Sequence, residues 1–262
     1  MTFWDHLDDL RKHIIRSLIA IVVLAVVAFL NREIIFDKII LAPSSTDFVT
    51  NKAMCWVGKQ LSLESLCVVP MKLDIININM SGQFMTHMYI SAVAGFILSF
   101  PYILWEIWHF VRPAMKEKEQ KYSRGGILIS TFLFLVGILF SYFVIVPLTV
   151  NFLGTYSVSE SVHNQISLNS YISTVVSLTF AVGVVFELPI LIYFLTKIGI
   201  VTPEYLKKNR RYMYIIILIL AAIITPPDVF SQTMVAIPLA ALYELSIVVS
   251  KKVYKKSYLD VG

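Results

Sequence analysis

The segment VVFELPILI, residues 184–192, decides how this chain can fold, because it places a carboxylate inside a long apolar run. The run extends from about Tyr171 to Leu195, and Glu187 is the single charged residue in it. A helix needs about 20 apolar residues to cross a bilayer. We therefore expect a membrane-spanning helix here, with Glu187 somewhat past its midpoint. Pro189 lacks the backbone N–H that a continuous helix would donate to the carbonyl group near position 185.

Glu187 has two possible interpretations. A charged side chain at the bilayer centre costs about 2.5–3.5 kcal/mol on insertion scales, so Glu187 is expected to face protein or water rather than lipid. Its carboxyl and the loosened backbone beside Pro189 together predict a polar notch. The carboxyl either faces a substrate or handles a proton, which is the default for an ionisable residue at this depth, or makes a structural hydrogen bond to a neighbouring helix.

The composition extends the membrane prediction to the whole chain. Of its 262 residues, 57% are hydrophobic and 15% are charged, whereas a soluble domain usually has about 25% charged residues. We therefore predict an all-α, polytopic membrane protein that forms a single integral membrane domain over residues 1–262. Its apolar segments fall at about 14–31, 84–111, 125–148, 169–198, 212–225 and 233–249.

The last two apolar segments are short for membrane spans. The fifth has 14 residues, or about 21 Å of helix, whereas the hydrocarbon core is about 30 Å thick. The sixth is borderline. The two segments either cross the membrane as short helices, which we favour, or form a re-entrant hairpin with PPD, residues 226–228, at its tip. The prediction is therefore six transmembrane helices, of which helices 5 and 6 are short.

The basic residues predict the orientation in the membrane. Of the 22 lysines and arginines, 17 lie in the N-terminus, the loops after helices 2 and 4, and the tail. The other five lie between Arg32 and Lys72. By the positive-inside rule, both termini are cytoplasmic. A re-entrant hairpin would give the same sides, so this rule does not separate the two alternatives.

Three polar parts flank the apolar segments. Residues 1–13 have an apolar face at helical spacing and are interpreted as an amphipathic cytoplasmic N-terminus. Residues 250–262 form a cytoplasmic tail. Residues 32–83 form a long extracytoplasmic loop that contains both cysteines of the chain, Cys55 and Cys67. A disulfide and two reduced thiols both remain open for this pair.

The sequence lacks the motifs of several enzyme classes. It has no P-loop, no GxSxG, HExxH or CxxC motif, and no histidine paired with a nucleophile in a hydrolase pattern. We therefore expect no enzyme activity, no cofactor, no metal site and no nucleic-acid partner. Glu106 and Glu244 lie near predicted helix ends among aromatic residues, and we expect both to be solvated interface residues.

Prolines recur within the apolar segments. They occur at positions 101, 147, 189 and 238. Proline kinks helices, and kinked helices can curve a bundle around a concavity. The prolines therefore predict kinked helices in a concave bundle, which is a statement about shape and not about chemistry.

Four segments, in order, resemble the motifs of one family. HLDDLRKH (6–13) resembles HL-x-ELR-x-R, and FPYILWEIWHFVRPAMKEKE (100–119) resembles P-x-IL-(Y)-x-x-W-x-F-x-x-PAL-x-x-E. FELPI (186–190) resembles FE-x-P-(I/V), and TPPDVFSQTMVAIPLAALYEL (225–245) resembles TPPD-x-x-SQ-x-x-x-A-x-P-x-x-x-x-(Y/F)E-(I/L). These motifs are typical of TatC, the receptor subunit of the twin-arginine (Sec-independent) protein translocase. The resemblance covers nearly the whole chain except about 45–76.

The resemblance implies a fold and a function. The fold would be six helices in a curved, cupped shape in the bacterial inner (cytoplasmic) membrane, with both termini cytoplasmic and the two short helices spanning. The family exports folded proteins whose signal peptides carry two consecutive arginines, and transport uses the proton-motive force. Implied partners are these signal peptides, single-span subunits of the TatA/TatB type docking along helices 5 and 6, and lipid, in a multimeric complex.

The resemblance also assigns residue roles. It places signal-peptide binding on Asp9, Arg11, Phe110, Pro113 and Glu119. Asp9 and Glu119 would bind the arginine pair, because a carboxylate matches the planar fork of a guanidinium better than it matches an ammonium. Asp9 is one methylene shorter than the glutamate of the motif.

Deeper in the membrane, the resemblance places Glu187 on the concave face, in contact with the inserted signal peptide or a partner's membrane helix. It assigns structural or partner-contact roles to Pro43, Phe84, Pro189, Asp228 and Gln232. Asp228 and Gln232 would cap and fix the hairpin between helices 5 and 6.

Two other classes of protein compete with this interpretation. A secondary transporter or channel could use Glu187 as its proton or ion site, but such proteins often have internal repeats, and residues 1–130 do not resemble residues 131–262. An intramembrane enzyme would need a nucleophile–base pair or paired aspartates within the spans, and neither is visible in the sequence.

Overall fold

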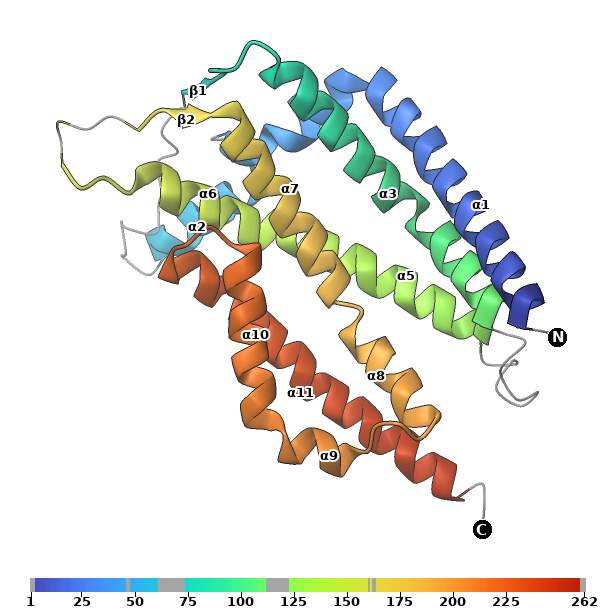
Figure 1. Ribbon diagram of the computed structural model, residues 1–262. Coiled ribbons are helices and arrows are strands. Elements are labelled where there is room, and N and C mark those ends of the chain that lie inside the picture. The colour runs from blue at the N-terminus through green and yellow to red at the C-terminus, as the bar shows by residue number, and fades with distance from the viewer. Residues whose placement is uncertain are drawn as a thin grey trace. The chain divides into compact units, whose positions relative to one another are not determined.

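A computed structural model describes residues 3–45, 48–60, 74–111, 123–159, 161 and 164–259. The described chain is mostly helical (Figure 1). Its α-helices are α1 (Phe3–Leu30), α2 (Val49–Gln60), α3 (Gly82–Val111), α5 (Ser123–Phe140), α6 (Val146–Thr155), α7 (Leu168–Val185), α8 (Leu188–Lys197), α9 (Pro203–Lys208), α10 (Arg210–Ile224) and α11 (Val229–Leu259). Short π- and 3-10 segments are η1 (Ile34–Ile40), η2 (Ala42–Ser44) and η5 (Ser141–Ile145).

Five helical stretches are long and apolar enough to cross a membrane, among the residues that the structure describes. They are Leu7–Leu30, Gly82–Phe110, Gly125–Thr155, Leu168–Lys197 and Val229–Lys255. The first four match the first four predicted spans, and the last contains the sixth. The fifth predicted span corresponds to α10, which has 15 residues. That α10 also crosses the membrane therefore stays a prediction.

The prediction that helix 6 is short is wrong. The helix that contains it, α11, has 31 residues and extends beyond both ends of the apolar segment 233–249. At its C-terminal end the helix continues through the polar sequence KKVYKKSYL, residues 251–259. Lysine has good helix propensity, so a helix does not end where its apolar run ends. The length of an apolar segment is therefore a lower limit for the length of its helix.

The chain divides into two compact units, and the first contains residues 1–42, 74–132 and 165–176. In this unit α1 and α3 lie side by side and antiparallel (Figure 1). They approach closely where Gly95 of α3 faces Ala25 of α1, since a Cβ atom at Gly95 would lie 2.6 Å from the Ala25 nitrogen. Glycine permits this approach because it has no Cβ atom. Close backbone packing at small residues is a common way for membrane helices to associate.

The first unit also contains a pair of two-residue strands that the all-α prediction did not include. Strands β1 (Ile75–Ile76) and β2 (Ile166–Ser167) pair in parallel, with Ile75 opposite Ile166. Two-residue strands leave almost no alternating pattern in a sequence, so this pair could not be recognised. It connects the end of the 32–83 loop to the segment that enters α7.

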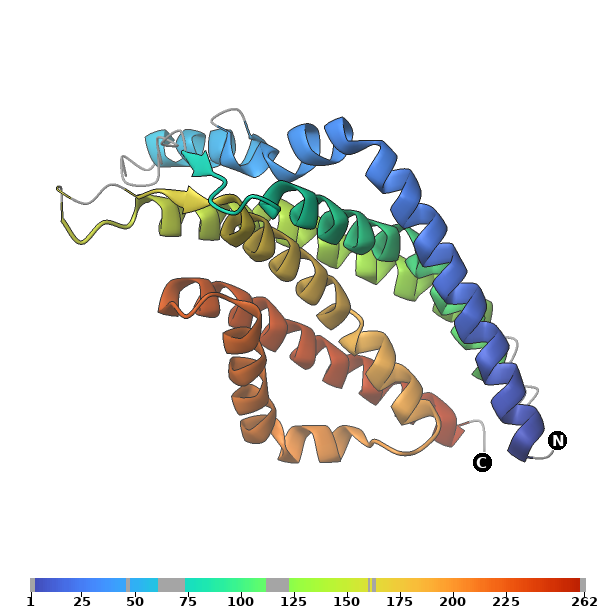
Figure 2. The same cartoon turned by 45° about the horizontal axis from the view of Figure 1, so that its top comes forward.

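The second unit contains residues 43–73, 133–164 and 177–262. Its most extensive packing is between α8 and α11, where the hydroxyl groups of Thr196 and Ser250 are hydrogen-bonded at 2.8 Å and are buried. Figure 2 shows α9 crossing from the end of α8 to the start of α10. The Tyr243 hydroxyl of α11 donates to the carbonyl oxygen of Leu206 in α9 at 2.7 Å, which holds this crosswise helix in place.

Part of the 32–83 segment, which was predicted to be an extracytoplasmic loop, is a helix of the second unit. In α2, Asn51 is buried and its side-chain oxygen accepts a hydrogen bond from the Asn151 amide of α6 at 2.8 Å. Cys55, on the same helix, is disulfide-bonded. The chain's other cysteine, Cys67, lies outside the described residues. These contacts give the inserted loop a structure that its polar sequence did not predict.

Candidate functional site

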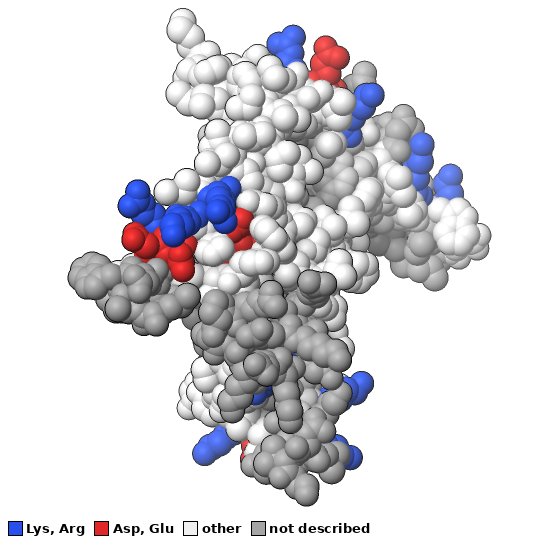
Figure 3. All heavy atoms as spheres, turned by 90° about the vertical axis from the view of Figure 1, so that its right-hand side faces the viewer, with Lys and Arg blue, Asp and Glu red and all other residues white. Residues whose placement is uncertain are grey.

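The beginning of α1 presents charges of both signs on an exposed surface. Asp8, Arg11, Lys12 and Arg16 are exposed, and Asp9 is partly exposed. Figure 3 faces the side on which α1 begins and shows a compact group of acidic and basic side chains there. A surface of this kind can bind a charged ligand by exchanging partners among its own ion pairs.

Asp9 and Lys12 form one such pair. Lys12 Nζ lies 3.1 Å from Asp9 Oδ1, and the two side chains are 65% and 42% exposed. They are three residues apart, so both project from one side of the helix. Exposed pairs of this kind contribute about 0.2–1 kcal/mol, and a stronger cation can therefore displace Lys12.

One turn further along α1, His13 reaches a buried carboxylate of α3. Its Nδ1 atom is hydrogen-bonded to Oε2 of Glu106, whose side chain is 1% exposed. The Tyr102 hydroxyl donates to the other oxygen, Oε1, at 2.6 Å. The ring of His13 also meets the Phe110 ring edge-on, with centroids 6.2 Å apart. Asp9 and Phe110 are thus brought to the same end of the α1–α3 pair through His13 and Glu106.

The expectation that Glu106 is solvated is wrong. Its neighbours in sequence are aromatic, which is typical of an interface, but α1 covers the carboxylate and supplies His13. Glu244 was also expected to be solvated, and its side chain is partly exposed. That side chain is 37% exposed, pairs with Arg210 and accepts from the Tyr214 hydroxyl at 2.7 Å.

Two predicted signal-peptide residues, Pro113 and Glu119, lie outside the described residues. Of the other three, Asp9 and Phe110 lie near the His13–Glu106 contact. Arg11 is exposed and lies two residues from both Asp9 and His13, so it projects from the other side of α1. The sequence analysis missed His13, Glu106 and Tyr102 as members of this site. The departure of His13 from the final arginine of its motif was the available signal.

Glu187 lies where the fourth span is interrupted. Helix α7 ends at Val185, and Glu187 is the N-cap residue of α8, whose first turn contains Pro189. Proline cannot donate to the carbonyl four residues earlier, so the helix breaks there. The Oε1 atom of Glu187 is buried. The break is also packed from the side, since a Cβ atom on Gly137 would lie 2.7 Å from the Phe186 side chain.

Asp228 and Gln232 connect α10 and α11. Asp228 Oδ1 accepts a hydrogen bond from the Ser231 backbone N–H at 2.7 Å, which is the geometry of a helix N-cap. Gln232 Nε2 donates to the carbonyl oxygen of Leu218 in α10 at 3.2 Å. Both side chains therefore make contacts that hold the turn between the two helices.

A basic surface lies where α9 meets α11. Lys207 of α9 lies beside Lys251 of α11, and the hydrogen bond and charge of Lys251 hold the pKa of Lys207 below its ordinary value. Desolvation of the amine lowers the pKa of Lys207 further, and the charge of Arg210 adds to the effect. Like charges this close indicate a surface that favours anions.

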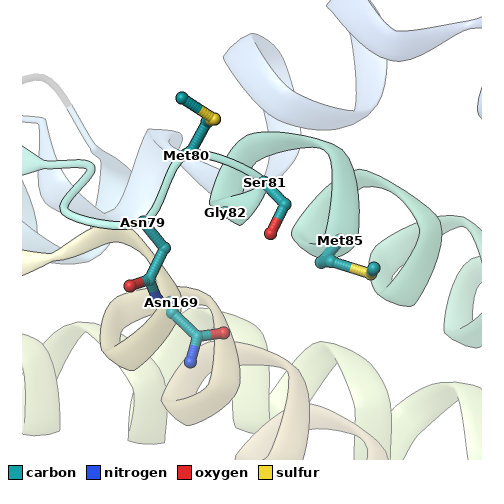
Figure 4. A pocket seen from close by; sticks show the side chains of 6 residues that line it. All are labelled: Asn79, Met80, Ser81, Gly82, Met85 and Asn169. Carbon is teal, nitrogen blue, oxygen red and sulfur yellow. The ribbon is translucent and has the colours of Figure 1, made fainter.

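Two cavities lie at the end of the first unit where α3 begins. The first has a volume of about 530 Å³ and is lined by Asn79, Met80, Ser81, Gly82, Met85 and Asn169. Figure 4 shows the Asn79 and Asn169 side chains next to each other and the Met80 side chain pointing away. The second, of about 540 Å³, is lined by Phe84, His87 and charged residues of the segment after α1. Pro43, in η2, is buried.

The chain matches the family model for the Sec-independent protein translocase protein (TatC) over residues 5–238. It is 42% identical, over 258 residues, to the Sec-independent protein translocase protein TatC of Blattabacterium sp. subsp. Periplaneta americana (strain BPLAN), with 98% of this chain and 97% of that protein covered. It is 34% identical, over 257 residues, to the protein TatCy of Bacillus subtilis (strain 168), with 98% and 91% covered.

The fold is similar to that of solved structures. One is a crystal structure of the twin-arginine translocase receptor TatC, with a TM-score of 0.71 and 32% sequence identity, which covers 95% of this chain and 99% of that chain. Another is a crystal structure of the same receptor in DDM, with a TM-score of 0.76 and 32% identity, which covers 94% and 99%. Both similarities extend over nearly the full length of the chain.

Proposed function

The chain belongs to the TatC family of Sec-independent protein translocase proteins, and from this membership we propose that it is the receptor and core subunit of a twin-arginine translocase. It binds signal peptides with two consecutive arginines on the cytoplasmic face and helps to export folded proteins, using the proton-motive force. It lies in the bacterial inner membrane with six spans, a concave surface and both termini cytoplasmic. No enzyme activity and no cofactor belong to this proposal.

The observation that carries the receptor proposal is the partly exposed Asp9 carboxylate, held by an ammonium group. Lys12 provides one point charge at 3.1 Å. An arginine of a signal peptide would replace it with a planar fork that donates two parallel hydrogen bonds. Glu119, Phe110 and Pro113 complete the proposed binding surface, and Arg11, on the other side of α1, orients this helix for signal-peptide binding. This exchange gives a physical reason for preferring arginine to lysine in the signal.

Glu187 and the break beside it form the second proposed site. A carboxylate at the end of α7 and the start of α8 can bind a polar group of an inserted signal peptide or of a partner's membrane helix. The partners are single-span subunits of the TatA/TatB type, which dock along α10 and α11. Pro189, Asp228 and Gln232 shape these surfaces, and Pro43 and Phe84 do the same at the outer end of the molecule.

Peptide binding to the full chain in lipid nanodiscs tests the receptor proposal. A fluorescent signal peptide with an RR pair is titrated in parallel with its KK twin against the wild type, Asp9→Asn and Glu119→Ala. We expect the wild type to prefer RR, and each variant to bind RR at least about tenfold more weakly, because a hydrogen bond to a charged group contributes about 1.5–3 kcal/mol. Asp9→Glu, which restores the residue of the family motif, should retain the preference. Equal binding of RR and KK by the folded wild type would remove the receptor proposal.

A further inference from the structure

Glu106 is a buried carboxylate whose oxygens have partners on two helices. Tyr102, one turn earlier on α3, binds Oε1, and His13 of α1 binds Oε2. A carboxylate that is 1% exposed is stable only when its oxygens are hydrogen-bonded, and removing one partner leaves the other group buried and uncompensated. The contact therefore strongly favours one alignment of α1 against α3.

The same contact controls the position of Asp9. Asp9 and His13 are four residues apart, so they lie on one face of α1. Along the helix axis, Asp9 lies about 6 Å from His13 toward the N-terminus, since a helix rises 1.5 Å per residue. The edge-on packing of His13 against Phe110 limits the rotation of α1 about its own axis. If α1 rotates or shifts at His13, the Asp9 carboxylate on the same helix therefore moves with it.

We infer that His13, Glu106 and Tyr102 form a positioning cluster that orients the Asp9 face of α1 for the arginine pair. This inference rests on the function proposed above and adds to it residues that set specificity without touching the ligand. Bidentate binding is sensitive to orientation, because a binding group must be held within about 0.5 Å of its productive geometry. An ammonium group, which is a point charge, is less sensitive. Loosening the cluster therefore weakens RR binding more than KK binding.

The chain provides a conservative variant and a matched control. The family motif ends in arginine where this chain has His13. His13→Arg thus retains a donor toward Glu106, whereas His13→Ala removes it. Ile15→Ala is the control, since Ile15 lies on the same part of α1 and is 44% exposed. Glu106→Gln keeps the volume and one acceptor oxygen, but it replaces the other oxygen with an NH2 donor and removes the charge.

The experiment measures RR and KK peptide affinity for the full chain in nanodiscs, with the unfolding temperature measured for each variant. We expect His13→Ala to weaken RR binding by roughly tenfold with little effect on KK binding, so that discrimination falls by a similar factor. Glu106→Gln should act in the same direction, and the double variant should be no worse than His13→Ala, because residues of one network are not additive. His13→Arg should restore discrimination to within about twofold, and Ile15→Ala should leave it unchanged.

The outcomes separate the inference from the proposed function. A wild type without RR preference removes the receptor proposal itself. A wild type with RR preference that His13→Ala leaves intact overturns the positioning cluster alone. Equal loss of RR and KK binding, with a lowered unfolding temperature, also overturns it, because a merely structural role reduces the folded fraction for both peptides.

A distance measurement checks the orientation directly. Spin labels are placed at Leu7 of α1 and Ile107 of α3, which are 40% and 50% exposed, in the non-reduced protein. We expect a narrow distance distribution in the wild type and in His13→Arg, and a broader or shifted one in His13→Ala. A distribution that His13→Ala leaves unchanged would contradict the inference, even if peptide binding were lost.

Discussion

Lys12 forms an ion pair with the Asp9 carboxylate of the same helix, with Nζ 3.1 Å from Oδ1. The negative charge of the proposed arginine-binding group is therefore already balanced by Lys12 before a signal peptide binds. Binding is an exchange of one cation for another, and its free energy is the difference between the two pairs. The exposure of both side chains keeps the internal pair weak, which makes the exchange favourable for a bidentate ligand.

Removing this competitor should strengthen signal-peptide binding. Lys12→Ala is expected to tighten RR binding by up to about fivefold, because an exposed pair contributes about 0.2–1 kcal/mol and about 1.4 kcal/mol corresponds to tenfold. The gain should shrink as salt is raised, since exposed charges are screened. Fluorescence anisotropy at two salt concentrations measures it. Lys59→Ala, at an exposed lysine of α2, is the control, and weaker binding by Lys12→Ala would contradict the exchange.

Glu187→Gln should separate binding from transport. The carboxylate lies at the α7–α8 break and is remote in sequence from Asp9, so RR affinity should stay within about twofold of the wild type. Export of a folded reporter with an RR signal should be reduced at least about tenfold, because an ionisable side chain inside the membrane costs free energy and commonly has a functional role there. Transport into inverted membrane vesicles gives this rate.

Glu204→Gln is the matched control for Glu187→Gln, since it removes an acidic side chain from the first turn of α9. Wild-type export by Glu187→Gln would show that its carboxylate has a structural hydrogen-bonding role, which an amide can also fill.

The Asp228 cap should contribute measurably to stability. Asp228→Ala removes the acceptor for the Ser231 N–H and should lower the free energy of unfolding by about 1 kcal/mol. Asp228→Asn should lose only a small part of this, because asparagine caps helices about equally well. Thermal unfolding in detergent compares the two variants. Equal destabilisation by both would mean that charge, and not the cap hydrogen bond, matters at this turn.

Lys251→Met should raise the pKa of Lys207 toward its ordinary value. Lys251 is the main cause of the lowered pKa, through its hydrogen bond and its positive charge, so removing it lets Lys207 keep its proton to higher pH. NMR of ¹³C-dimethylated lysines, which retain their charge, follows the titration. Lys252→Met is the matched control and should leave the Lys207 titration unchanged.

The sequence predicted the features that depend on neighbours along the chain. Pro189 predicted a loosened backbone near position 185 in the fourth span, and the structure ends α7 at Val185. The first four apolar segments matched helices that can span a membrane. Such predictions succeed because the missing N–H of proline and the length of an apolar run act locally.

The features that depend on distant contacts could not be predicted in this way. His13 and Glu106 are 93 residues apart, and nothing near either residue indicates that α1 covers the carboxylate. The pairing of Ile75 with Ile166 has the same origin. The length of α11 was underestimated for a local reason. Its polar C-terminal turns are helical although they have no apolar pattern.

The close approach of Gly95 to Ala25 has a consequence for biogenesis. Membrane helices can associate once each has been inserted, and α1 and α3 together need only the first 111 residues of the chain. A nascent chain can therefore assemble the hairpin that carries Asp9, His13 and Glu106 while the residues of α7 to α11 are still being synthesised. The part of the proposed recognition surface that lies on α1 and α3 would then form before the Glu187 site exists, so the order of translation alone would make this hairpin the first part of the proposed site to form.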